Sequence, residues 1–86
     1  MRTLHLGNPA GAEATRMQPV ESSAVAALGY DAPSRTLFVR FRQVGLYAYL
    51  EVPPAVFEAF RDAPSKGRFF QEAIDPAFRY LRVEGA

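Results

Sequence analysis

The stretches that decide the fold are TLFVRFR at residues 36–42 and LYAYLEV at residues 46–52, joined by a short QVG link. Both are rich in aromatic and β-branched residues, which is typical of strands. Side chains alternate between the two faces of a strand, so Leu37, Val39 and Phe41 share one face. The two stretches therefore predict a β-hairpin at the centre of the fold.

The pairing register of this hairpin decides whether Tyr47 and Tyr49 belong to the core or to the surface. If the link is a three-residue loop closed by Gly45 in the left-handed region, Arg42 pairs with Leu46. Both tyrosines then join the apolar face of the first strand. If the loop has four residues, both emerge beside the arginines of that strand as an aromatic and basic surface. The fit of Gly45 to the first arrangement favours buried tyrosines.

Two short helices are expected after the hairpin. Pro53-Pro54 ends the second strand, and the second proline suits the first turn of a helix over residues 55–63. Ser65 is a good cap for a second helix over residues 66–74. We predict an α+β fold, in which two short helices lie on one face of an antiparallel sheet of three or four strands.

The segments that flank the hairpin give weaker signals. Residues 20–30 fit either a strand or a short helix, and the strand is favoured. Asp31-Ala32-Pro33-Ser34 has the composition of a turn. Residues 78–83 fit either a helical turn or a final strand, and the pattern leaves both open.

The N-terminal residues differ from the rest of the chain. Residues 1–16 mix Gly, Ala, Pro and Thr without periodicity, which predicts a flexible tail dispensable for folding. The alternative is a short edge strand at Leu4-His5-Leu6. Residues 17–86 are then predicted to form a single domain, as the total length of 86 residues allows.

Composition excludes several classes of function. The chain has no Cys and one His, at position 5, which argues against Cys-ligated zinc, thiol nucleophiles and Ser-His triads. The net charge of +1 excludes the broad positive field of a protein that packages DNA. No apolar run is long enough for a signal peptide or a membrane span. We expect a cytoplasmic protein that is not an enzyme and uses no cofactor or metal.

The chain carries a series of short motifs in a characteristic order. They are Pro19-Val20-Glu21-Ser22-Ser23, Gly29-Tyr30-Asp31, the alternating Leu37, Val39 and Phe41, Tyr47-Ala48-Tyr49, Val52-Pro53, and Ala63, Ser65 and Gly67. This order resembles the KTSC domain, a family named from the C-terminus of some lysyl-tRNA synthetases. The likeness spans residues 17–82. It implies a small module of undetermined function, for which the synthetase fusion and the central Tyr-x-Tyr suggest RNA binding.

Candidate nucleic-acid contacts are two aromatic and four basic residues: Tyr47, Tyr49, Arg40, Arg42, Lys66 and Arg68. Two tyrosines on one strand face have the spacing to stack bases if they are exposed. The two arginines project from one strand, and the other two cations flank a helix start that favours phosphate. A non-catalytic binding module with RNA as ligand is therefore favoured. The alternative is a protein-interaction or self-associating module, which salt should weaken much less.

The sheet face opposite the tyrosines is expected to carry Phe38, Leu46, Ala48 and Leu50. This face is too apolar to be left in water. We expect either the helices of the chain or another chain to cover it.

Overall fold

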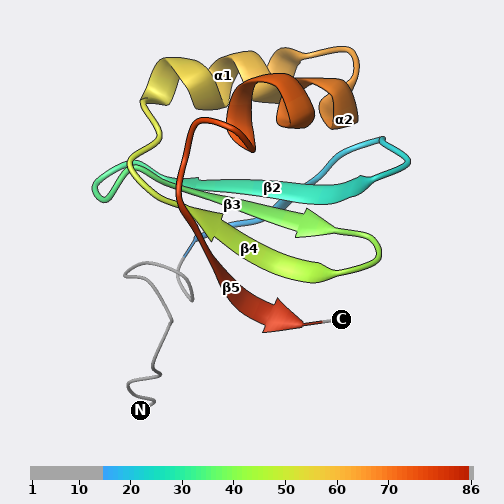
Figure 1. Cartoon of the computed structure of the whole chain (residues 1–86), viewed down its shortest axis with the longest axis horizontal. Helices are drawn as coiled ribbons and strands as arrows, with labels where there is room; N and C mark the ends of the chain where they lie inside the picture. Colours follow the sequence, from blue (N-terminus) through green and yellow to red (C-terminus); the bar gives the residue numbers. More distant parts are fainter. Residues whose placement is uncertain (1–14, 86) are drawn as a thin grey trace.

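The computed structural model describes residues 15–85 as a five-stranded antiparallel sheet with helices packed on one face, an α+β fold (Figure 1). In chain order the elements are β1 (Gln18–Pro19), β2 (Val25–Asp31), β3 (Thr36–Phe41), β4 (Gly45–Tyr49), α1 (Pro54–Asp62), α2 (Lys66–Phe69), η1 (Phe70–Ile74) and β5 (Tyr80–Gly85). Each strand pairs with the next one along the chain, so the spatial order is the sequence order.

The α+β fold is confirmed, but the sheet has five strands and not three or four, because β1 was not predicted and β5 was left open. β1 has two residues, too few for an alternating pattern to be recognised in the sequence. β5 lies in the segment for which the sequence allowed either a strand or a helical turn. Its antiparallel pairing with β4 shows that it is a strand. Both additions depend on tertiary contacts that a local pattern does not contain.

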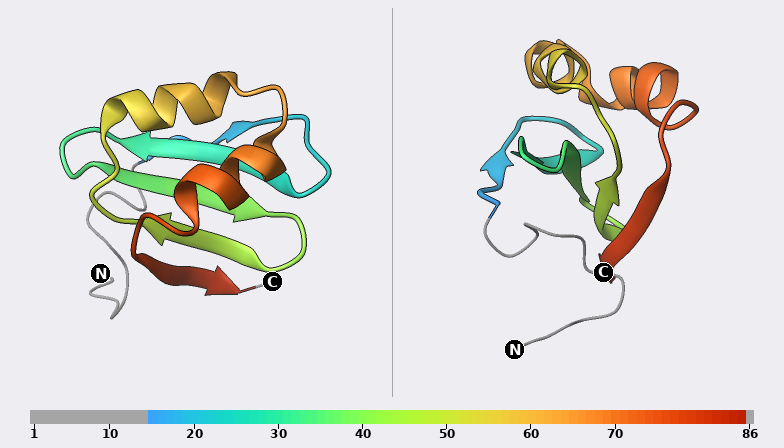
Figure 2. Two further views of the ribbon diagram at one scale, coloured as in Figure 1. Left: turned by 45° about the horizontal axis from the view of Figure 1, so that its top comes forward. Right: turned by 90° about the vertical axis from the view of Figure 1, so that its left-hand side faces the viewer.

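The two helical segments lie where the sequence predicted them. Pro54 opens α1, and Ser65 caps α2 by accepting a hydrogen bond from the backbone N–H of Arg68 at 3.2 Å. The second segment continues beyond α2 as the π-helical turn η1. Figure 2 shows both helices on the same face of the sheet, with β5 at one edge.

The hairpin forms with a register that differs from the predicted one. Leu46 was predicted to pair with Arg42, but in the structure it pairs with Arg40, two residues earlier. Phe41 accordingly pairs with Gly45, and Val39 pairs with Tyr47. Gly45 does adopt a positive φ of 104°, but it belongs to the strand and the loop precedes it. A shift of two residues restores the same faces, so the tyrosines still lie on the predicted side of the sheet.

The main core lies between the sheet and the helices. Its buried residues are Val25, Leu28, Leu37, Val39, Tyr49, Val52, Phe60 and Ile74. Tyr30 ties α1 to this core, since its ring stacks on Phe57 with centroids 4.8 Å apart and its hydroxyl donates to the carbonyl of Val52 at 2.6 Å. These contacts hold α1 over β2.

A second buried cluster lies on the opposite face of the sheet. Phe38 is only 1% exposed there, and Met17 and Val83 pack against its cluster with Leu46 and Ala48. The expected cover by the helices of the chain is wrong, because both helices lie on the other face. Phe38, Leu46 and Ala48 are nevertheless buried within the chain, and Leu50 is half-buried.

The first described residues run close over Gly29. A Cβ atom at this position would lie 2.6 Å from Sδ of Met17 and 2.9 Å from the carbonyl oxygen of Arg16, so only glycine fits. Thr15 and Arg16, which the sequence placed in a flexible tail, therefore contact the sheet. The remainder of that tail, with Leu4-His5-Leu6, lies outside the described residues. Within residues 15–85 no helix has the length and hydrophobicity needed to cross a bilayer.

Candidate functional site

Tyr47 and Tyr49 do not form an open stacking surface by themselves. Tyr49 is 3% exposed and packs edge-on against Phe70 of η1, with ring centroids 5.5 Å apart. Tyr47 is half-buried and meets Phe41 edge-on at 5.7 Å. The prediction that both lie on the core side is confirmed, and Tyr47 is the one that reaches the surface.

The two strand arginines do not act as a pair. Arg40 is half-buried on the sheet face opposite the helices, where it pairs with Leu46. Arg42 lies in the loop, and its guanidinium donates to the carbonyl oxygen of Ser22 at 2.7 Å and to that of Val20 at 3.4 Å. The role of Arg42 in the fold is thus to tie this loop to the segment before β2.

The two helix cations also have partners within the chain. Lys66 donates through Nζ to the carbonyl oxygen of Ala63 at 2.6 Å. Arg68 is exposed and lies 3.7 Å from the carboxylate of Glu72, one turn further along. The structure therefore does not gather the four predicted cations around the two tyrosines.

A different aromatic group reaches the surface at the edge of the sheet. Tyr80 opens β5, is 54% exposed, and lies 5.6 Å from the ring of Tyr47 and 5.5 Å from the ring of Tyr49. The buried ring of Tyr49 packs against the ring of Tyr80. The Tyr80 ring is thus held in place by aromatic neighbours while much of it faces solvent.

Two exposed arginines lie close to Tyr80 along the chain. Arg82 is the register partner of Tyr47, so its side chain leaves the sheet on the same face. Arg79 is also exposed and directly precedes Tyr80; its carbonyl accepts from the backbone N–H of Leu50 at 2.9 Å. We call Tyr47, Tyr80, Arg79 and Arg82 the edge surface. It combines a preorganised aromatic face with two cations.

The sequence did not single out Tyr80, Arg79 or Arg82 as functional. The missing signal was the identity of β5, because only its pairing with β4 brings Tyr80 beside Tyr47. A Tyr-x-Arg in an extended segment following two aromatic-rich strands is the pattern that could have pointed to it. This pattern can be recognised only when the last segment is known to be a strand.

Burial of Tyr49 predicts an alkaline limit to stability. Desolvation raises the pKa of the Tyr49 phenol well above its ordinary value near 10, and that of Tyr30 in the same direction. The unfolded chain then releases these protons at lower pH than the folded chain, so stability is lost as pH rises above about 10.

The measurement is the midpoint of urea unfolding between pH 8 and pH 12. We expect a steady fall above about pH 10, with a shallower slope for Tyr49→Phe than for the unsubstituted protein. Tyr80→Phe serves as the control because that ring is half exposed. Equal slopes in all three proteins would contradict the burial of the Tyr49 hydroxyl.

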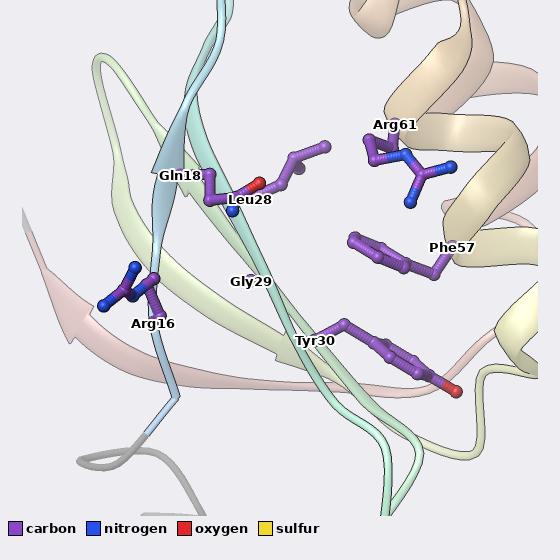
Figure 3. A pocket seen from close by; sticks show the side chains of 7 residues that line it. All are labelled: Arg16, Gln18, Leu28, Gly29, Tyr30, Phe57 and Arg61. Carbon is purple, nitrogen blue, oxygen red and sulfur yellow. The ribbon is translucent and has the colours of Figure 1, made fainter.

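A hollow of about 320 Å³ lies on the far side of the molecule, between α1 and the edge formed by β1 and β2 (Figure 3). Several of its polar groups are engaged in the fold. Arg61 forms a two-point ion pair with Asp62 at 2.9 and 3.1 Å and lies over the Phe57 ring. The Tyr30 hydroxyl is held by Val52. We therefore interpret this hollow as the edge of the packed core and not as a binding site.

No metal centre is evident in the part of the chain that the structure describes, where no three His, Cys, Asp or Glu side chains converge. The buried side-chain nitrogen and oxygen atoms in that part all have hydrogen-bond partners.

Comparison with known proteins places this architecture in a family. The family model of the KTSC domain matches residues 21–78, more than half of the chain. The chain belongs to the KTSC domain family. The crystal structure of a KTSC domain protein from Yersinia pestis has a TM-score of 0.79 and 40% sequence identity, covering 80% of this chain and 97% of that one. The resemblance drawn from the sequence motifs is confirmed.

KTSC relatives occur in two settings. A protein from Tsukamurella paurometabola is 49% identical over 67 residues, which is 78% of this chain and 100% of the relative. A lysine–tRNA ligase from Nostoc punctiforme is 35% identical over 63 residues, which is 73% of this chain but 11% of the ligase. The KTSC domain is thus similar to a small protein and to one part of a large tRNA ligase.

Proposed function

We propose that this KTSC domain is a non-catalytic module that binds single-stranded RNA through the edge surface. The observation that carries the proposal is the Tyr80 ring, half exposed and braced by Tyr47 and Tyr49, beside Arg82. Aromatic rings on a sheet stack with unpaired bases, and neighbouring arginines neutralise phosphates. The similarity to part of a lysine–tRNA ligase supports RNA over other polyanions.

The geometry favours single strands over duplex RNA. Stacking on Tyr80 requires a base that is not already stacked and paired within a helix. Two cations, Arg79 and Arg82, are few for the wide backbone contacts of a duplex binder. Binding is thus expected to be modest in affinity, with stacking contributing as much as charge.

One observation favours a second candidate function, a protein-interaction or self-associating module. Leu81 is 38% exposed on β5, and β5 is an edge strand with no partner on its outer side within residues 15–85. Such edges can pair with another chain. The two functions differ in their response to salt, since apolar contacts do not weaken as salt rises whereas phosphate contacts do.

The test is fluorescence anisotropy with a labelled single-stranded RNA of mixed sequence, titrated with the protein at several salt concentrations. Two phosphate contacts at about 0.7 each predict a slope of about −1.4 in log K against log salt. A duplex of the same length should bind more weakly. Absence of binding at low salt, with concentration-dependent association by light scattering, would replace the RNA proposal with the second candidate.

A further inference from the structure

A small hollow opens next to the edge surface. It has a volume of about 250 Å³ and is lined by Leu50, Glu51, Ala77, Phe78 and Arg79. Pockets for drug-sized ligands span roughly 300 to 1,000 Å³, so this hollow suits one flat group. The N–H of Leu50 donates to the carbonyl of Arg79 next to the Tyr49–Tyr80 pair, so the hollow lies at the end of the β4–β5 pairing where Tyr80 begins.

The backbone at the rim of the hollow is strained. Glu51 has a φ of 56°, in the left-handed region that glycine or asparagine adopts at lower cost. Hydrogen bonds on either side hold the turn: the N–H of Leu50 donates to Arg79, and the N–H of Val52 donates to Arg35 at 2.8 Å. The turn itself therefore gives no reason for a glutamate side chain.

The three chemical groups in the hollow differ in kind. Phe78 offers a half-buried aromatic face, Arg79 a cation, and Glu51 an exposed carboxylate. A carboxylate repels the phosphates of RNA. It therefore weakens RNA binding unless it forms hydrogen bonds with a base. Its two oxygens only accept hydrogen bonds, so its natural partner on a base is a pair of adjacent donors.

Resting on the proposed function, we propose that this hollow selects guanine in the bound RNA strand. Among the four bases only guanine presents two adjacent donors on its Watson–Crick edge, the N1–H and the N2 amino group, which match the two oxygens of Glu51. The base stacks on Phe78, and Arg79 neutralises a flanking phosphate. Adenine, cytosine and uracil each offer one donor at that edge and leave a carboxylate oxygen unpaired.

The test compares the binding of four labelled hexamers, UUUGUU, UUUAUU, UUUCUU and UUUUUU, by fluorescence anisotropy. The unsubstituted protein should bind UUUGUU about tenfold more tightly than the other three, within the range of a two-point base contact. Glu51→Gln should remove most of this preference, and it should let the other three hexamers bind at least as tightly as before, because the repulsion between the carboxylate and the phosphates is gone. Glu58→Gln, which alters an exposed carboxylate on α1 outside the hollow, should preserve the preference.

A second variant separates folding from recognition. Glu51→Gly removes the carboxylate and relieves the positive φ, so it should fold at least as stably as the unsubstituted protein and still lose the preference for guanine. Equal binding of the four hexamers would overturn guanine selection while leaving RNA binding intact. Absence of binding to any hexamer would overturn both proposals. A preference for guanine that survives both substitutions at Glu51 would overturn the role of this residue.

Discussion

Replacing Tyr49 with alanine is expected to lower the free energy of unfolding by about 3 kcal/mol, the loss typical of truncating a buried aromatic side chain. Tyr49 is 3% exposed, and its ring contacts Phe70 of η1 and Tyr80 of β5. Its removal leaves a cavity where β4 meets the helical layer and the last strand. Domains are typically stable by only 5–15 kcal/mol, so about 3 kcal/mol is a large fraction of the total.

Urea unfolding followed by circular dichroism measures this loss. Tyr80→Ala is the matched control: the same substitution on the neighbouring strand at a ring that is 54% exposed, for which we expect less than about 1 kcal/mol. A loss below about 0.5 kcal/mol for Tyr49→Ala would show that this ring is not part of the core.

Tyr80→Ala should lower RNA affinity strongly although it lowers stability only slightly. Stacking of one base on an aromatic ring contributes about 1–3 kcal/mol, so the substitution is expected to weaken binding of single-stranded RNA about tenfold. Tyr80→Phe keeps the ring and should retain most of the affinity. Equal affinity of Tyr80→Ala and the unsubstituted protein would exclude stacking on this residue.

Three further variants show whether the loss is specific to the edge surface. Arg82→Gln should weaken binding and make it less dependent on salt, because one phosphate contact is lost. Arg68→Gln removes an exposed arginine from α2 and should change little, since Arg68 lies in the helical layer beside Glu72. Val44→Ala, at an exposed apolar residue in the hairpin loop, controls for general loss of apolar surface.

The elements that the sequence predicted well are those with strong local signals. The hairpin, the turn at Asp31 and the cap at Ser65 depend on residues close together in the chain, and the structure contains all three. The face of the tyrosines was also predictable, although the register was wrong by two residues, because strand faces repeat every two residues.

The elements that the sequence did not predict, or left open, depend on distant contacts. β1 is held by pairing with Leu28 and Ala27, and β5 by pairing with β4. Distant contacts also decide the surroundings of a candidate site residue. Arg42 looked available for phosphate, but its guanidinium is held by the carbonyls of Ser22 and Val20, some 20 residues earlier. Tyr80 looked ordinary until β5 placed it beside Tyr47.

The most direct test of the account is an NMR titration of the ¹⁵N-labelled protein with a single-stranded RNA hexamer that contains one guanine. Binding at the edge surface predicts the largest amide shifts at Tyr47 and at residues 79–82, with smaller ones at Leu50 and Glu51. The amide resonances of residues near Arg42 and Lys66 should not shift. Shifts concentrated at Arg42, Lys66 and Arg68, or no shifts at low salt, would contradict the account.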